Sequence, residues 1–226
     1  MPQIAIENIT KTYAVGNERI HAVKTISLSV EKGDFISIVG HSGSGKTTLL
    51  SMIGGITRPS TGSIVVDGVD ILALESDRIS EYRCGKIGFM FQFASLLPML
   101  TIKENLLLPT VFLSKRSGDE VGKAETLLRM VGLFDKIHAY PPQLSGGQQR
   151  RVAIARAFMN DPAMILADEP TGDLDEETEL DMLKFFRTMN ETHGTTFLMV
   201  THNTDLARQA KRRLRMHQGS IREEQR

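Results

Sequence analysis

The chain has little with which to form covalent cross-links or to cross a membrane. Its single cysteine, Cys84, excludes an internal disulfide framework and fits a reducing compartment. No catalytic-cysteine pattern surrounds Cys84, so we interpret it as a bystander. No apolar run approaches the roughly 18 residues of a membrane span, and the N-terminus lacks the regions of a signal peptide. We therefore expect a cytoplasmic protein that serves any membrane process through partners.

The chain also has no net charge, no internal repeat and no low-complexity segment. Its 27 Lys and Arg residues balance 27 Asp and Glu residues, so no global charge favours nucleic acid, and we expect no nucleic-acid partner. Hydrophobic residues make up 41% and charged residues 24%, which is ordinary for a globular protein. The length of 226 residues predicts one large domain, or one core with subdomains.

A phosphate-binding motif lies near the N-terminal end. Residues 40–47 read G-H-S-G-S-G-K-T and fit the pattern G-x-x-x-x-G-K-[ST]. The motif follows the apolar run 35–39, which predicts a buried strand, and precedes 48–53, which predicts a helix. Its glycines let backbone N–H groups approach phosphate oxygens, and the helix N-terminus adds partial positive charge. The candidate nucleotide-binding residues are Gly40, His41, Ser42, Gly43, Ser44, Gly45, Lys46, Thr47 and Thr48.

Two residues of the motif have distinct chemical roles. Lys46 can reach the β- and γ-phosphates, and the Thr47 hydroxyl can ligate Mg²⁺. Two other interpretations are a chance match in a surface loop and a dinucleotide site. The strand and helix flanks argue against the first. The second fails because the spacing is not G-x-G-x-x-G and no acidic residue follows at the ribose distance.

Strand and helix patterns predict an α/β protein. Residues 3–9, 27–30 and 63–66 predict antiparallel strands around the phosphate-loop strand, and Asp67-Gly68 is a hairpin signal. Apolar runs predict buried strands at 87–91, 163–167 and 196–200, while 120–131 and 176–191 have helical patterns. A strand, a long crossover helix and a second strand imply a parallel sheet.

An acidic pair follows the expected strand 163–167. Ligands of open α/β sheets bind beyond the carboxyl ends of the strands, so Asp168 and Glu169 would face the phosphate loop if the strands are neighbours. Asp168 then suits Mg²⁺, and Glu169 suits polarisation of an attacking water. The alternative is a solvated acid pair at the end of a strand.

A second motif, Leu144-Ser145-Gly146-Gly147-Gln148, opens an expected helix. With the phosphate loop and the acidic pair, it makes the chain resemble the ATPase subunit of ABC transporters over essentially its whole length. The resemblance implies ATP and Mg²⁺ as cofactors, with Ser145, Gly146, Gly147 and Gln148 meeting the γ-phosphate held by a second subunit. A helix N-terminus with two glycines is chemically a further anion site.

The resemblance implies roles for further residues. Tyr13 stands where the family stacks a ring on adenine, although a Tyr at a strand end is an alternative. Gln92 matches a glutamine linked to the metal and to coupling, and His202 matches a histidine that contacts the γ-phosphate, against a purely structural His. Asp175 lies in the segment 172–175, which resembles the loop at the dimer interface. The implied catalytic residues are Glu169, His202 and Lys46, and the implied metal ligands are Thr47, Gln92 and Asp168.

A narrower resemblance surrounds Gln92. Residues 91–101, followed by Glu104-Asn105 and Leu108-Pro109, are similar to the subfamily that drives lipoprotein release and macrolide or peptide export. The alternative is that Leu96, Leu97 and Leu100 only fill a helical core.

The chain departs from the family pattern at two positions. His41 replaces a common proline at an unconstrained slot, so it puts little in doubt. Asp173 stands where asparagine is frequent, and its charge could weaken closure of a dimer. Equal ATP-driven dimerisation by wild type and Asp173→Asn would exclude that effect.

A late basic cluster comprises Lys211, Arg212, Arg213 and Arg215. We interpret it as a solvated edge, with anionic lipid or a partner subunit as the alternative.

Together these patterns predict a RecA-like P-loop NTPase core with an N-terminal antiparallel β-subdomain and an inserted helical subdomain. The core and β-subdomain would comprise about 1–92 and 158–226, and the helical subdomain about 93–157. The resemblance further implies that two copies close head to tail around ATP at the cytoplasmic face of a membrane, where they move permease subunits and an extracytoplasmic adaptor. The alternatives are a regulatory ATPase acting on a cell-wall enzyme through a membrane partner, and a soluble ABC protein acting on DNA or ribosomes.

Overall fold

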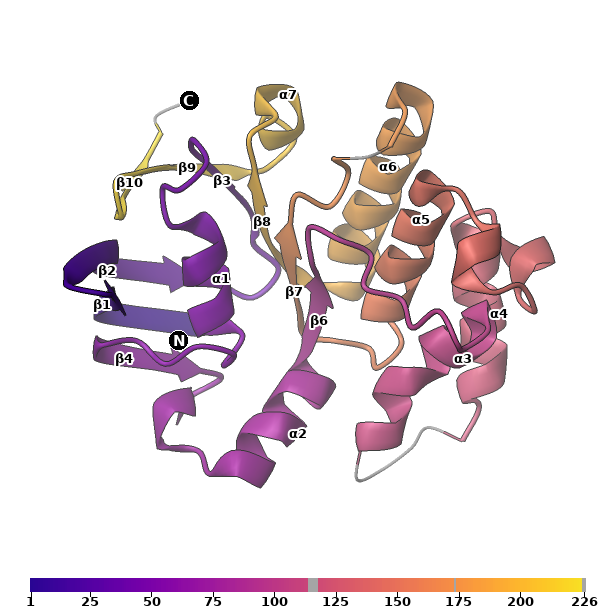
Figure 1. Cartoon of the computed structure of the whole chain (residues 1–226), viewed down its shortest axis with the longest axis horizontal. Helices are drawn as coiled ribbons and strands as arrows, with labels where there is room; N and C mark the ends of the chain where they lie inside the picture. Colours follow the sequence, from indigo (N-terminus) through magenta and orange to yellow (C-terminus); the bar gives the residue numbers. More distant parts are fainter. Residues whose placement is uncertain (114–117, 173, 225–226) are drawn as a thin grey trace. The chain divides into compact units, whose positions relative to one another are not determined.

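The computed structural model describes residues 1–113, 118–172 and 174–224 (Figure 1). The chain forms two compact units. Unit 1 comprises Met1–Ile79 with Thr196–Arg226, and unit 2 comprises Ser80–Thr195. Unit 1 therefore contains segments from both ends of the chain, whereas unit 2 is one continuous segment. Among the described residues, none of the helices combines the length and the apolarity that crossing a membrane would need.

The first sheet of unit 1 is antiparallel. Its strand order is β2-β1-β4-β5, with β1 at Ile4–Val15, β2 at Glu18–Val30, β4 at Thr61–Val66 and β5 at Val69–Asp70. The buried side of β1 carries Ile4 and Ile6, as the alternation predicts, and also Ile9, which follows a register shift. Both β1 and β2 are longer than predicted, because register shifts between them break the alternation on which the prediction depends.

The phosphate-loop strand belongs to a different sheet of unit 1. Strand β3 (Phe35–Val39) pairs in parallel with β8 (Thr196–Thr201) and with β9 (Arg212–His217). Strand β10 (Ser220–Glu223) extends the order as an antiparallel partner of β9. All residues of β3 and β8 are buried, which explains their unbroken apolar runs. Helix α1 (Lys46–Ile53) follows β3 directly, and the short helix α7 (Thr204–Ala207) follows β8.

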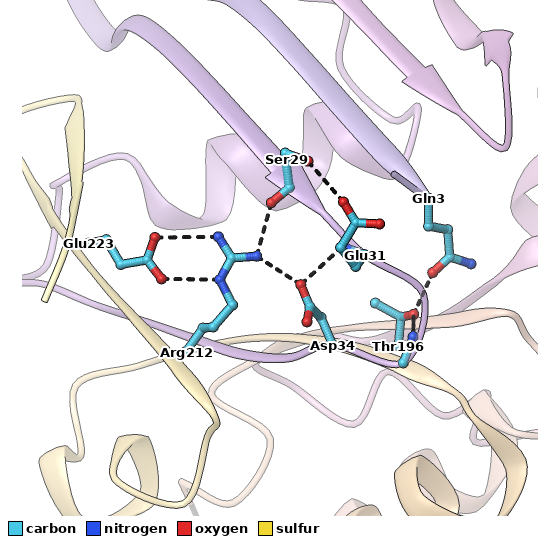
Figure 2. Close-up of polar contacts among 8 residues, drawn as sticks. Gln3, Ser29, Glu31, Asp34, Thr196, Arg212 and Glu223 are labelled. Atoms are coloured by element: carbon cyan, nitrogen blue, oxygen red, sulfur yellow. Dashed lines mark hydrogen bonds and ion pairs between the residues drawn. The ribbon is translucent and has the colours of Figure 1, made fainter. Parts of the chain in front are cut away.

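A polar network joins the two ends of the chain within unit 1 (Figure 2). Arg212 forms ion pairs with Asp34 at 2.7 Å and with Glu223 at 3.1 Å, and it also donates to the backbone oxygen of Ser29. Hydrogen bonds with Glu223, and secondarily with Asp34, raise the pKa of Arg212. Arg212 therefore ties strand β9 to the turn that precedes β3.

Unit 2 contains two parallel strands and most of the helices. Strand β6 (Ile87–Met90) pairs with β7 (Met164–Asp168). The helices are α2 (Ser76–Lys86, which begins in unit 1), α3 (Ile102–Leu107), α4 (Glu120–Met130), α5 (Gly146–Ala157) and α6 (Glu176–His193). Helices α3, α4 and α5 contact one another, and α5 also contacts β6. Short 3-10 turns lie at Ile71–Ala73 in unit 1, and at Leu108–Phe112, Phe134–Lys136 and Pro141–Gln143 in unit 2.

Helices α3, α4, α5 and α6 begin at side-chain caps that the sequence contains. Thr101 and Glu104 form a capping box at the start of α3, and Asp119 caps α4 by accepting from the N–H of Gly122 at 3.1 Å. Helix α6 ends at Gly194, whose left-handed conformation (φ 66°) is typical of a helix C-terminus. These signals explain why most helices predicted by pattern lie within a few residues of their observed bounds.

Candidate nucleotide-binding site

The phosphate loop connects β3 to α1 in a backbone conformation that requires glycine. Gly43 has φ 75°, and Gly45, which precedes the first residue of α1, has φ 105°. A Cβ atom on Gly45 would lie 2.2 Å from the backbone oxygen of Ala22, and one on Gly40 would lie 2.3 Å from that of Met216. The loop is therefore held close to the surrounding backbone, and the N-terminus of α1, which follows it directly, adds partial positive charge.

Polar groups inside the loop fit a bound anion. Lys46 is 8% exposed, and its ammonium group donates to the backbone oxygens of Gly40 at 2.7 Å and His41 at 3.1 Å. The buried Ser44 hydroxyl finds no hydrogen-bond partner within the described residues. A buried cation and an unsatisfied hydroxyl at a helix N-terminus are groups that phosphate oxygens can satisfy.

Two further candidates of unit 1 lie near strand ends. Val39 pairs with Thr201 across β3 and β8, so Gly40 and the exposed His202 follow neighbouring strands at one edge of the sheet. Tyr13 lies in β1 and is exposed, with the Lys11 ammonium 5.1 Å from the centre of its ring. An exposed aromatic face of this kind is available for stacking on a base.

The acidic pair lies at the end of β7 in unit 2. Asp168 is the last residue of the strand and is buried, whereas Glu169 is half-buried. Glu169 has φ 48°, an unfavourable conformation for a residue with a side chain. Met90 pairs with Ala167, so the segment that contains Gln92 and the acidic pair leave two adjacent parallel strands at the same edge.

The loop after β6 carries exposed apolar side chains around Gln92. Phe93 is 75% exposed and Met99 is 71% exposed, and Phe91 and Leu97 are also exposed. The alternative in which Leu97 only fills a core therefore does not hold for this residue. Buried Asn105 holds this loop by accepting from the Leu97 N–H at 2.7 Å and by donating to three backbone oxygens of 97–101.

The glycine pair of the second motif begins helix α5. The Ser145 hydroxyl accepts from the N–H of Gln148 at 3.2 Å, and the Gln148 amide oxygen accepts from the N–H of Ser145 at 2.9 Å. Gly146 is exposed, and a Cβ atom added to it would meet nothing within 4 Å. The start of α5 is thus exposed at the surface of unit 2, and a helix N-terminus of this kind can accept an anion.

Asp175 caps helix α6. Its carboxylate accepts from the N–H of Thr178 at 3.0 Å and from the Thr178 hydroxyl at 2.7 Å, and these bonds lower the pKa of Asp175. Asp173 lies outside the described residues.

Comparison with known proteins shows the family of the chain. A family model described as "ABC transporter" matches residues 23–172. The chain belongs to the ABC transporter family.

The chain is also similar to ABC proteins over nearly its whole length. It is 42% identical to the uncharacterized ABC transporter ATP-binding protein MJ0796 of Methanocaldococcus jannaschii, over 98% of this chain and 96% of that one. It is 41% identical to the macrolide export ATP-binding/permease protein MacB of Rhodopirellula baltica, over 98% of this chain. The chain spans only about a third of the length of that relative, 33%.

A solved structure matches the fold. It is the dimeric post-hydrolysis state of the ATP-binding cassette MJ0796 bound to ADP and Pi, with a TM-score of 0.93, 40% identity and 98% coverage of both chains. The P-loop α/β fold predicted from the sequence is therefore confirmed, and the chain is an ATP-binding ATPase of the transporter type.

Sequence reasoning missed one residue of this ABC ATPase, Arg150. It is buried on α5 and hydrogen bonds to backbone oxygens after both β6 and β7. The sequence did indicate that Arg150 is unusual, because helical spacing places it on the same face as buried Ala153 and Ile154. A charged residue on a buried helix face indicates a specific partner.

The structure also bears on the sequence-based interpretations of the basic cluster (Lys211, Arg212, Arg213 and Arg215) and of Cys84. The basic cluster is not only a solvated edge, because Arg212 forms the network of Figure 2 and Arg215 pairs with Glu224 at 2.5 Å.

Burial raises the pKa of the Cys84 thiol, which disfavours the reactive thiolate and fits a bystander role.

Proposed function

We propose that the chain is the motor subunit of a membrane exporter or lipoprotein-release system, in which ATP closes a dimer. The observation that carries this proposal is the exposed start of α5, where Ser145 caps the helix and a Cβ on Gly146 would meet none of the described residues within 4 Å. The phosphate loop of this ATPase already binds the phosphates of its own nucleotide. An exposed anion site at the start of α5 would therefore bind a phosphate from another molecule. A second copy, bound head to tail, brings the nucleotide held by its own loop.

In this proposal each nucleotide lies between two chains. Lys46 and the backbone of its loop bind the phosphates, and Tyr13 stacks on the base. Residues Ser145 to Gln148 of the opposite chain contact the γ-phosphate. Support comes from the relative solved as a dimer with ADP and Pi, to which this chain is 40% identical.

We assign the hydrolytic step to residues that follow the strands. Glu169 polarises the attacking water, and His202 contacts the γ-phosphate. Thr47, Gln92 and Asp168 would hold Mg²⁺, which neutralises phosphate charge when bound. One carboxylate with a hydroxyl and an amide is a donor set that suits Mg²⁺ shared with phosphates. In the described part of the chain, no cluster of three or more His, Cys, Asp or Glu could hold a metal alone.

Contact with a permease is assigned to the loop around Gln92. Phe91, Phe93, Leu97 and Met99 expose apolar surface there, and patches of this kind usually mark an interaction site. The relatives that join an ATP-binding segment to a permease in one polypeptide support a membrane partner. The ATPase would then lie at the cytoplasmic face of the membrane, with an extracytoplasmic adaptor as a further partner.

The first test is the Glu169→Gln variant. We expect it to bind ATP and to form an ATP-dependent dimer in size-exclusion chromatography. Its ATP turnover should fall on the order of 100-fold or more, because general-base assistance contributes about that much. Glu191→Gln, an exposed position near the end of α6, is the matched control and should hydrolyse at the wild-type rate. Wild-type turnover by Glu169→Gln would exclude Glu169 as the residue that polarises water.

The second test identifies the partner. Tagged Glu169→Gln is trapped with ATP in its native membrane, and the proteins that co-purify are identified. A partner with few membrane helices and a large extracytoplasmic domain supports export or lipoprotein release. A many-helix bundle without such a domain would point to a conventional transporter, and the absence of any membrane partner would contradict the proposal.

A further inference from the structure

Arg150 is a charged side chain inside unit 2. It is 3% exposed and lies on α5, about one turn after the exposed start of that helix. Burial of a guanidinium group removes its hydration, so a buried arginine persists only where its N–H donors find acceptors.

Arg150 finds these acceptors in two separate chain segments. Its Nε donates to the backbone oxygen of Pro170 at 2.8 Å, and its Nη2 donates to that of Glu169. Its Nη1 donates to the backbone oxygens of Phe91 at 2.6 Å and Gln92 at 2.5 Å. One planar group therefore connects the segments that follow β6 and β7.

The backbone of Glu169 needs such support. Its φ of 48° lies in the left-handed region, which a residue with a side chain occupies only when its surroundings enforce it. Arg150 binds the backbone oxygens of Glu169 and of the following Pro170, so it restrains the backbone from which the Glu169 carboxylate projects.

We propose that Arg150 is a positioning residue for ATP hydrolysis, which fixes the backbones of Gln92 and Glu169 to each other and to helix α5. The inference rests on the proposed roles of Gln92 and Glu169. It adds a mechanical consequence: a partner that moves the Gln92 loop also moves Glu169, because both are bound to one rigid guanidinium. Contact with a permease could thereby change the rate of hydrolysis through Arg150.

Only arginine has the geometry for this role. Its guanidinium presents five N–H donors in a fixed plane, so it can bind two segments at once. A lysine at the same position retains the charge but has a single nitrogen, which cannot span both pairs of backbone oxygens. Arg150→Lys is therefore the substitution that separates geometry from charge.

Arg156 provides a matched control on the same helix. It donates to the backbone oxygens of Ala94 and Ser95, each at 2.9 Å, so it holds the same loop a few residues further along. Its hydrogen bonds to that loop do not include Gln92 or Glu169. Arg156→Lys should disturb the loop and the helix without directly releasing Glu169.

The experiment measures kcat and KM for ATP in the full chain, with circular dichroism as a check of folding. We expect Arg150→Lys to lower kcat by ~10- to 100-fold, since small displacements of a catalytic group have effects of this size. KM should change less than about threefold, because the phosphate loop is untouched. Arg156→Lys should keep kcat within about threefold of wild type.

A double variant tests whether Arg150 acts through Glu169. If it does, Arg150→Lys adds no further loss of kcat in the Glu169→Gln background. Hydrogen exchange should also become faster in both 90–95 and 168–172 of folded Arg150→Lys. Losses that multiply in the double variant would overturn the proposal, as would equal losses in Arg150→Lys and Arg156→Lys.

Two further outcomes are decisive. If Arg150→Lys does not fold, Arg150→Met is measured in its place. If both fail to fold, Arg150 is a folding residue and the proposal is overturned. Wild-type turnover by Glu169→Gln would exclude the proposed role of Glu169. Wild-type turnover by Arg150→Lys beside an impaired Glu169→Gln would overturn only the role of Arg150, so the two failures are distinguishable.

Discussion

At the scale of single residues, the conformation of the phosphate loop depends on glycines, which have no Cβ atom. Gly43 and Gly45 both have positive φ, but only Gly45 also lies against other backbone. Substitutions at these two positions can therefore separate the cost of a positive φ from the cost of a clash between a Cβ atom and the neighbouring backbone.

This difference predicts unequal costs for two alanine substitutions. Gly43→Ala should cost about 1–2 kcal/mol, the penalty for a side chain in the left-handed region, since a Cβ there meets nothing within 4 Å. Gly45→Ala should cost a further ~1–3 kcal/mol, because its Cβ would overlap the backbone oxygen of Ala22. Urea denaturation of both variants measures the difference. Equal losses would mean that the loop moves away from Ala22 without cost.

Single residues also show which features a sequence pattern can predict and which it cannot. Lys46, Asp168 and Glu169 were predicted from their motifs, since the chemistry of those motifs depends on local spacing. Arg150 was not, because its four backbone acceptors come from segments about 20 and 60 residues away.

At the scale of elements, the start of α5 combines a structural cap with a proposed binding site. Ser145 accepts a backbone hydrogen bond as Asp119 does at the start of α4. Both caps lie in unit 2 and both are exposed. The two caps can be compared directly, because only the helix that Ser145 caps is proposed to contact the γ-phosphate.

We expect Ser145→Ala and Asp119→Ala each to lower stability by about 1 kcal/mol, the usual cost of losing an N-cap. Only Ser145→Ala should also reduce ATP turnover and ATP-dependent dimerisation, because only that helix is proposed to meet the γ-phosphate. Thermal melts and a phosphate-release assay on both variants make the comparison. A similar fall in turnover for Asp119→Ala would attribute the effect to lost stability.

Elements differ in how visible they are in the sequence. Strands β3, β7 and β8 were predicted within a residue or two, because each is a short, fully buried and mostly apolar segment. Helix α2 was not predicted, since it has no buried residue and hence no apolar periodicity. Strand β9 was interpreted as a basic cluster because the partners of Arg212 are brought to it only by tertiary structure.

At the scale of the whole molecule, unit 1 is assembled from both ends of the chain. Arg212 bonds to Asp34 across 178 positions of sequence, and Thr196 bonds to Gln3 and to the backbone of Gly33 (Figure 2). The C-terminal segment is therefore part of the unit that carries the phosphate loop.

Two arginines of β9 give a test of this assembly. Arg212→Ala should destabilise the protein by about 1–3 kcal/mol, because its charged hydrogen bonds are partly shielded, with the side chain 28% exposed. Arg215→Ala removes one pair with Glu224 from a side chain that is 44% exposed, so its cost should be under about 1 kcal/mol. Denaturation at low and high salt compares them. Equal stability of the two variants would contradict the inference that the hydrogen bonds of Arg212 join the two ends of the chain in unit 1.

The sequence by itself determined the chemistry: the phosphate loop, the acidic pair, the glycine-pair helix and the caps are all local patterns whose spacing carries their meaning. Tertiary structure decided which strands pair, how the two ends of the chain join in unit 1, and that Arg150 binds the segments after β6 and β7. The physical reason is the range of the interactions. Helix caps and turns depend on neighbours a few residues away, whereas sheet pairing and buried charge depend on partners that only folding brings together.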